Sequence, residues 1–238
     1  PAMKILVFGG AGFLGSYVVD ELVSRGHDVT IFDRRKSPYH GDEVTTIVAD
    51  ILDRDAVNSA VNGHSVVYNF AGQPDIGRSL EFPVETIEAN VRGNLYVLEA
   101  CRQSGIERFI YASTAYVFSQ KGGFYGTSKK CSERIIEEYS EQYGLNFTII
   151  RYGSVYGERA DRQNRIYKLL HSALLTNRII FPGDGSEERE YIHGRDAARL
   201  SVDILDSSFE NQHIILTGME RYQYSDVLHL INEILGNK

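Results

Sequence analysis

Residues 4–16 read KILVFGGAGFLGS, and this stretch decides the fold of the 238-residue chain. The apolar run Ile5 to Phe8 predicts a short buried strand that stops at glycines. A helix follows, and its first apolar residues are Phe13, Leu14, Val18 and Val19. Such a unit suits a dinucleotide pyrophosphate, because glycines permit a tight turn and close approach, and a helix N-terminus offers free N–H groups.

The glycines fit two overlapping spacings, GxGxxG at Gly10, Gly12 and Gly15 and GxxGxxG at Gly9, Gly12 and Gly15. Either spacing alone is a weak signal. A second β-prone run, 27–32, ends at Asp33, close to the ~20 residues beyond the glycines where a ribose-binding carboxylate is expected. A carboxylate there favours NAD, because it would repel a 2′-phosphate. Arg34 and Arg35 follow and can pair with such a phosphate, so the residues leave NADP open.

Composition excludes several classes of protein. The net charge of −7 and the pI near 5.5 argue against a nucleic-acid or anionic-membrane partner. No apolar run approaches the ~18 residues that span a bilayer, and no leader pattern precedes the first strand. Cys101 and Cys131 fall in predicted helices rather than in a CxxC pair. We therefore expect a cytoplasmic protein with reduced cysteines and no metal site.

The rest of the chain alternates strands with helices. Further strands are expected at 44–48, 64–70, 106–112 and 145–151, and helices at 54–61, 83–104 and through 133–143. This alternation predicts an α/β, Rossmann-type doubly wound parallel sheet, with ligands at the carboxyl ends of the strands. Beyond Arg151 we expect, in order, a helix at 162–175, short strands at 178–181 and 190–192, a helix at 194–205, a further strand at 213–216 and a helix at 225–235.

Two parts follow from this pattern. We expect an NAD-binding domain at 1–152, to which 190–216 returns, and a small substrate-binding cap made of 153–189 and 217–238. Asp50 is placed to reach an adenine edge, or else to cap the helix at 54–61. The residues expected to line the cofactor on this side of the sheet are Gly9, Gly10, Gly12, Phe13, Leu14, Gly15, Asp33, Arg34, Asp50, Ile51, Ala71 and Gly72.

The chemistry is expected at a tyrosine and a lysine. Tyr125 and Lys129 are four residues apart at the start of a helix, so both side chains project from one face. The ammonium should lower the phenol pKa from about 10 toward working pH, where the phenolate acts as a general base. Ser113 and Thr114, at the end of the strand at 106–112, can supply a hydroxyl to the same substrate oxygen. Tyr125 and Lys129 are also expected to contact the cofactor.

Six segments, taken together and in order, resemble the extended short-chain dehydrogenase/reductase superfamily, in its NAD-dependent sugar-nucleotide epimerase/dehydratase branch. They are GGAGFLG, the aspartate after the second strand, NVRGNLYVLEAC, ASTAYVF, YGTSK and GDGSEEREYIHGRDAA. The resemblance implies that Tyr125 is the base, that Lys129 lowers its pKa and binds the nicotinamide ribose, and that Thr114 polarises the reacting hydroxyl. It also implies that Asn90 supports the lysine through water.

The resemblance also implies a substrate, a nucleotide sugar. Arg189 matches an arginine that contacts the substrate diphosphate, with a salt bridge to Glu187 or Glu190 as the alternative. Ser154 stands where relatives carry an asparagine that meets the substrate. The loop between Thr114 and Tyr125 is shorter than in sugar-nucleotide relatives, and the chain ends where relatives continue. We therefore expect a shortened cap with a weaker grip on the nucleotide.

Substitutions within the motifs narrow the reaction. Family dehydratases carry an Asp-Glu pair after the catalytic threonine, and decarboxylases carry a glutamate at the second of these positions. Here the two residues are Ala115 and Tyr116. The resemblance then implies 4-epimerisation of an NDP-hexose by transient oxidation and re-reduction. An NAD(P)-dependent reductase of an NDP-keto-sugar and a non-catalytic NAD-binding sensor or scaffold are the alternatives.

Relatives dimerise through a four-helix bundle, which corresponds here to helices 83–104 and 125–143. The resemblance therefore implies a homodimer. Apolar positions on these helices support it, namely Val91, Leu95, Ile135 and Ile136.

Overall fold

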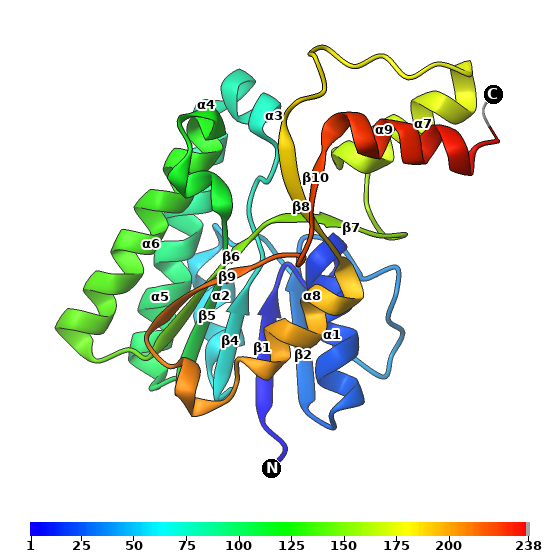
Figure 1. The fold of residues 1–238 in the computed structure, drawn as a ribbon. Coiled ribbons are helices and arrows are strands. Elements are labelled where there is room, and N and C mark those ends of the chain that lie inside the picture. The colour runs from blue at the N-terminus through cyan, green and yellow to red at the C-terminus, as the bar shows by residue number, and fades with distance from the viewer. Residues whose placement is uncertain (237–238) are drawn as a thin grey trace.

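A computed structural model describes residues 1–236 of the chain, and its centre is a seven-stranded parallel sheet (Figure 1). The sheet has the order β3-β2-β1-β4-β5-β6-β9. Its strands are β1 (Lys4–Phe8), β2 (Asp28–Asp33), β3 (Thr45–Val48), β4 (Val66–Asn69), β5 (Arg108–Thr114), β6 (Phe147–Tyr152) and β9 (Gln212–Leu216). The predicted Rossmann-type fold is confirmed, and β9 is the strand expected at 213–216.

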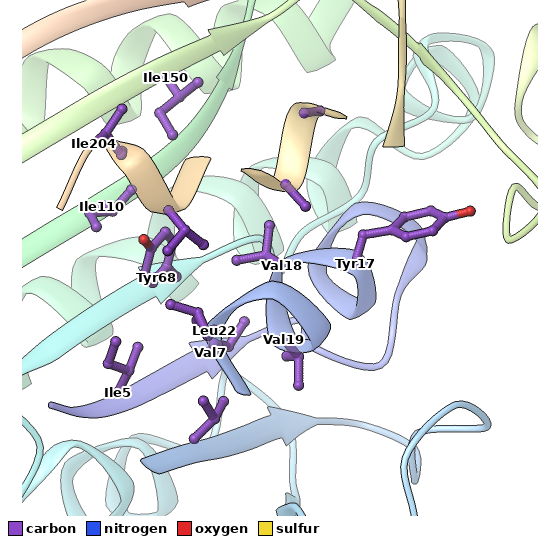
Figure 2. Packing of buried hydrophobic residues seen from close by; sticks show 14 of the residues in the cluster. Ile5, Val7, Tyr17, Val18, Val19, Leu22, Tyr68, Ile110, Ile150 and Ile204 are labelled. Atoms are coloured by element: carbon purple, nitrogen blue, oxygen red, sulfur yellow. The ribbon is translucent and has the colours of Figure 1, made fainter. Parts of the chain in front are cut away.

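Helices cover both faces of the sheet, because alternate residues of each strand point to opposite sides. Ile5 and Val7 of β1 pack with helices α1 (Phe13–Ser24) and α8 (Gly194–Asp203) in one apolar core. Leu6 and Phe8 pack in a second core under helices α2 (Arg54–Val61), α5 (Gly93–Ser104) and α6 (Gly123–Tyr143). Figure 2 shows the first core, where Val18 and Leu22 of α1 lie against the strands.

The second core corrects one prediction about the dimer. Ile136 of α6 is fully buried in that core, so it is unavailable to another chain. Leu95 of α5 is exposed, and Val91 and Ile135 are half-buried.

A smaller part of the chain, here called the cap, lies over the carboxyl ends of the strands, at the upper right of Figure 1. It contains a three-stranded sheet, β10-β8-β7, formed by β7 (Ser154–Tyr156), β8 (Glu188–His193) and β10 (Arg221–Gln223). Helices α7 (Arg165–Thr176) and α9 (Tyr224–Ile234) share a small apolar core there. The prediction of a strand at 178–181 is wrong, because these residues form no strand. Strands β7 and β10 were not predicted. The division into an NAD-binding domain and a cap stays a prediction, and residues 237 and 238 of that cap lie outside the described residues.

The helix expected at 83–104 is divided in the structure. It consists of α4 (Pro83–Ile87), a π-helical turn (Glu88–Arg92) and α5. A short helix that was not expected, α3 (Ile76–Glu81), precedes it. π-Helical turns are rare and often occur at functional sites. Among residues 1–236, no helix combines the length and the apolarity needed to cross a membrane.

The glycine turn provides a test of the fold. A Cβ at Gly15 would lie 2.2 Å from the Gly9 carbonyl oxygen, which is backbone and has no room to move. Gly15→Ala should therefore lower the free energy of unfolding by about 3 kcal/mol. Chemical denaturation measures the effect.

Gly77→Ala is the matched control, because Gly77 is exposed in helix α3 and a Cβ there would meet only the Asp75 side chain (3.3 Å), which can move, rather than backbone. Its stability should be unchanged or raised by up to about 1 kcal/mol. Equal denaturation midpoints for Gly15→Ala and the unaltered chain would contradict this account of the turn.

Candidate active site

The glycine turn leaves a helix N-terminus open for an anion. Gly9, at φ +75°, donates its N–H to the Phe32 carbonyl (2.8 Å), which fixes the end of β1 beside β2. The close contact of Gly15 with Gly9 brings the first turn of α1 against the strand. Gly12 caps α1 without a side-chain hydrogen bond, and no acidic residue lies in the first turn. The N-terminus of α1 therefore fits a pyrophosphate group.

Asp33 is tied directly to this turn. One carboxylate oxygen accepts the Ala11 N–H (3.1 Å), and the other accepts the Arg35 N–H (3.3 Å). The Arg35 guanidinium reaches the Ala11 carbonyl at 3.4 Å, while Arg34 is exposed beside it. The carboxylate thus lies at the carboxyl edge of β2, next to the phosphate-binding turn, where it can accept ribose hydroxyls.

The predictions for two residues after β3, Asp50 and Ile51, need correction. Asp50 accepts the Leu52 N–H (2.9 Å), whereas Asp53 caps α2 by accepting the Ala56 N–H (3.0 Å). The alternative role of Asp50 as the helix cap is therefore wrong. Ile51 is buried against α5, since a Cβ at Gly93 would lie 2.8 Å from its side chain. The Ile51 side chain belongs to the core, which leaves only its backbone to line a cofactor.

Asn90 holds the loop after β4 against helix α6. It is buried in the π-helical turn, and its amide exchanges two hydrogen bonds with the backbone of Gln73 (2.7 and 3.0 Å). The same amide donates to the Ser128 hydroxyl (2.9 Å). A Cβ at Gly72, where φ is +150°, would lie 2.4 Å from the Asn90 amide oxygen. Asn90 thus fixes the loop at Ala71 and Gly72 and reaches the neighbour of Lys129, while its role through water stays a prediction.

The structure brings Tyr125, Lys129 and Thr114 together. Tyr125 lies in the first turn of α6 and donates its N–H to the Ser79 hydroxyl (3.1 Å). The Lys129 ammonium lies 5.9 Å from the centre of the Tyr125 ring and donates to the Ala112 carbonyl of β5 (2.9 Å). Thr114 ends β5, and its hydroxyl accepts the Tyr116 N–H (3.2 Å). This arrangement points a hydroxyl, a phenol and an ammonium at one edge of the sheet.

Burial sets the pKa values of this group. Desolvation lowers the pKa of Lys129 to about 8, and the nearby Glu133 carboxylate opposes that change. The pKa of Tyr125 is raised to about 12, because desolvation outweighs the hydrogen bond from Thr114 that lowers it. The pKa of Tyr125 is therefore raised in this structure, contrary to the predicted lowering, while the contribution of Lys129 itself stays a prediction. At neutral pH the phenol holds its proton and the ammonium is charged.

Ser113 does not belong to the site. Successive strand residues point to opposite faces, so Ser113 and Thr114 diverge. The Ser113 hydroxyl donates to the Glu133 carboxylate of α6 at 2.5 Å, beneath the helix. Its predicted role in substrate binding is wrong, because the hydroxyl is buried and already engaged.

Arg189 lies on β8 of the cap and faces residues 115–122, the loop after Thr114 that is here called the catalytic loop. Its guanidinium pairs with Glu187 (2.6 Å) and lies 5.1 Å from the centre of the Tyr116 ring. The ion pair expected as the alternative is therefore formed, while Glu190 pairs with Arg221 (2.8 Å). The Arg189 Nε is buried and has no hydrogen-bond partner among the described residues. A diphosphate role stays a prediction, as does substrate binding by Ser154 on β7.

Sequence reasoning missed several residues that support the site. Ser128 lies within the motif YGTSK and Arg151 begins the segment RYGSVYG that contains Ser154, whereas the others carry no local signal. They are Gln73, Ser79, Ser128, Glu133 and Arg151.

Comparison with known proteins places this geometry in a family. The model of the NAD-dependent epimerase/dehydratase family matches residues 5–218. The chain belongs to this family. A UDP-glucose 4-epimerase of Erwinia amylovora is 32% identical over 86% of the chain and 74% of that protein. A UDP-N-acetyl-alpha-D-glucosaminuronate decarboxylase of Bacillus cytotoxicus is 29% identical over 97% of the chain and 80% of that protein.

The chain is also similar to a solved structure of a UDP-glucose 4-epimerase. The UDP-glucose 4-epimerase of Thermus thermophilus in complex with NAD is 29% identical to the chain. It superimposes with a TM-score of 0.86 and covers 98% of this chain and 84% of that one. This member of the NAD-dependent epimerase/dehydratase family is thus an enzyme with NAD as its cofactor. The open N-terminus of α1 and the carboxylate of Asp33 fit that cofactor.

The buried ammonium generates a prediction about stability. Folded Lys129 loses its proton near pH 8, whereas the unfolded residue does so near its ordinary value of 10.5. The unfolded chain binds more protons between these values, so Lys129 adds stability as the pH rises. The free energy of unfolding, relative to Lys129→Met, should increase by about 2 kcal/mol between about pH 8 and pH 10.

Denaturant titrations at several pH values measure this difference. Lys130→Met is the control, because Lys130 is exposed on the next position of α6 and should show no such trend. A difference for Lys129→Met that stays level or falls over the same range would refute the assignment.

Proposed function

We propose that the protein is an NAD-dependent 4-epimerase of an NDP-hexose, acting by transient oxidation and re-reduction at one carbon. The observation that carries the proposal is the grouping of Thr114, Tyr125 and Lys129 beside a loop in which Ala115 and Tyr116 replace carboxylates. Neither position therefore carries the carboxyl group that the resemblance assigns to dehydratases and decarboxylases there. The relatives that are UDP-glucose 4-epimerases support the same reaction.

The chain's own residues account for binding and proton transfer. The glycine turn and Asp33 would hold the dinucleotide, and Lys129 its ribose, while NAD supplies the hydride acceptor that later returns the hydride. Because the phenol is protonated at neutral pH, it must ionise before it can act as the base, and the nearby Lys129 ammonium favours that ionisation. Tyr125 would then take the hydroxyl proton of the sugar and give it back in the reverse step. Thr114 accepts the Tyr116 N–H, so its own proton can be donated to Tyr125, with which it is hydrogen-bonded, or to the substrate oxygen. Arg189 would hold the diphosphate through its unpartnered Nε.

The two alternatives differ from this proposal in testable ways. A reductase of an NDP-keto-sugar would use the same three residues. It would only reduce the keto group to an alcohol, without first oxidising an alcohol. A sensor or scaffold would bind NAD and leave the trio idle. The presence of Tyr125, Lys129 and Thr114 together argues against the sensor, because a protein that only binds NAD gains little from that trio.

Proton NMR of UDP-, GDP- and dTDP-hexoses incubated with the protein and NAD tests the proposal. We expect the C4 epimer of one substrate to appear. Tyr125→Phe should slow its formation at least ~100-fold, because the group that moves the proton is gone. Tyr139→Phe is the matched control, since its hydroxyl bonds Glu99 near the other end of α6. No new signal from an NAD-binding protein would favour the reductase or the sensor instead.

We also propose that the enzyme is a homodimer, paired through helices α5 and α6, and that it acts in the cytoplasm. The free cysteines Cys101 and Cys131 fit a reducing compartment. The exposed side chain of Leu95 on α5 supports the interface.

Sedimentation at micromolar concentration should give about twice the 26.8 kDa chain mass. Leu95→Glu should yield monomers, because it places a charge in an apolar interface. Leu230→Glu, on the exposed side of α9, should leave the dimer intact. A monomeric profile for the unaltered chain would rule the dimer out.

A further inference from the structure

Helix α6 contacts β5 through three side chains spaced four residues apart. Tyr125, Lys129 and Glu133 lie on one face of the helix. Tyr125 meets Thr114, Lys129 donates to the Ala112 carbonyl (2.9 Å), and Glu133 accepts from the Ser113 hydroxyl (2.5 Å). The third contact lies one helical turn beyond the ammonium and belongs to no motif used so far.

Glu133 is an acidic group in the protein interior. Its residue is 4% exposed, and the Arg151 guanidinium of β6 binds the same carboxylate at 2.6 and 3.1 Å. A buried carboxylate is costly unless it is paired and hydrogen-bonded, and Glu133 has both kinds of partner. Arg151 also lies 4.6 Å from the centre of the Phe118 ring, in the loop that follows Thr114. The ion pair therefore connects the core of the site to the catalytic loop.

Few charges surround the Lys129 ammonium. The groups facing it from α6 are Tyr125 and Glu133, and from β5 the ring of Tyr111, whose centre lies 4.7 Å away. The π-helical turn contributes Asn90, which is neutral, and β6 contributes Arg151 through Glu133. Glu133 lies one helical turn from Lys129 on the same face of α6, and the two side chains bind adjacent residues of β5, Ser113 and Ala112. This placement brings a carboxylate close enough to act on the ammonium.

We propose that Glu133 is a positioning residue, which keeps Lys129 charged and seated against β5, and that Arg151 limits how strongly it does so. The proposal deepens the proposed function and rests on it, since the ammonium matters for catalysis only if Tyr125 and Lys129 carry the reaction. The hydroxyl of Ser113 donates to the Glu133 carboxylate and so holds that side chain against β5.

An NMR titration of the intact protein, carrying lysine labelled with ¹³C at Cε, tests the proposal directly. Lys129→Arg identifies the Lys129 signal by its loss. Glu133→Gln should lower the titration midpoint of Lys129 by about one pH unit, because it removes the carboxylate charge. Arg151→Met should raise the midpoint, because the carboxylate then acts on the ammonium without a competing guanidinium. A purely structural role predicts no such opposite shifts.

Two controls keep the outcome decisive. Glu137→Gln removes a carboxylate one turn further along α6, where it pairs with Arg134 and His213, and should leave the Lys129 midpoint unchanged. Ser113→Ala removes a hydrogen bond to Glu133 and keeps the charge, so it should shift the midpoint much less than Glu133→Gln. If Glu133→Gln does not fold, the upward shift of Arg151→Met alone supports the proposal and its absence overturns it.

The titration needs neither NAD nor a nucleotide sugar, so it stands even if no epimerisation is found. An unchanged midpoint in folded Glu133→Gln, or shifts of the same sign in both variants, would overturn the inference. Where epimerisation is observed, the alkaline limb of the rate profile should move with the Lys129 midpoint in each variant.

Discussion

The rest of this structure depends on keeping one ammonium group charged inside the protein. Lys129 is buried between β5 and α6, where desolvation favours the neutral form. A backbone carbonyl, an aromatic ring and a carboxylate one turn away offset part of that cost. These partners come from one strand and one helix. The packing of α6 on the sheet is thus an electrostatic requirement as well as an apolar one.

The carboxyl ends of the strands are held closely by two further contacts. The Gly15 contact with the Gly9 carbonyl seats α1 on β1, and the Asn90 amide fixes the loop after β4 against α6. Both contacts use positions where a side chain or a regular helix would not fit. A parallel sheet gathers the carboxyl ends of its strands at one edge. The loops at that edge can therefore be held by few, specific contacts.

Tyr116 connects this edge to the cap. Its N–H holds the Thr114 hydroxyl, and its ring lies under the Arg189 guanidinium. The resemblance described above implies that family members that eliminate water carry a carboxylate at this position. Tyr116 has no carboxylate, and its ring supplies a surface for a cation instead. One substitution thus changes both the available chemistry and the contact between the two parts of the site.

Local patterns in the sequence by themselves determined the strand, turn and helix at 4–16, the parallel sheet, and the spacing of Tyr125 and Lys129. Periodicity and glycine spacing are local properties, so they can be recognised without knowing which residues are neighbours in the folded protein. Tertiary structure alone decided which way Ser113 points, that Ile51 and Ile136 belong to the core, and that Asn90 lies in a π-helical turn. It also decided the direction of the Tyr125 pKa. Desolvation and pairing depend on segments far apart in the chain, and no local pattern reports them.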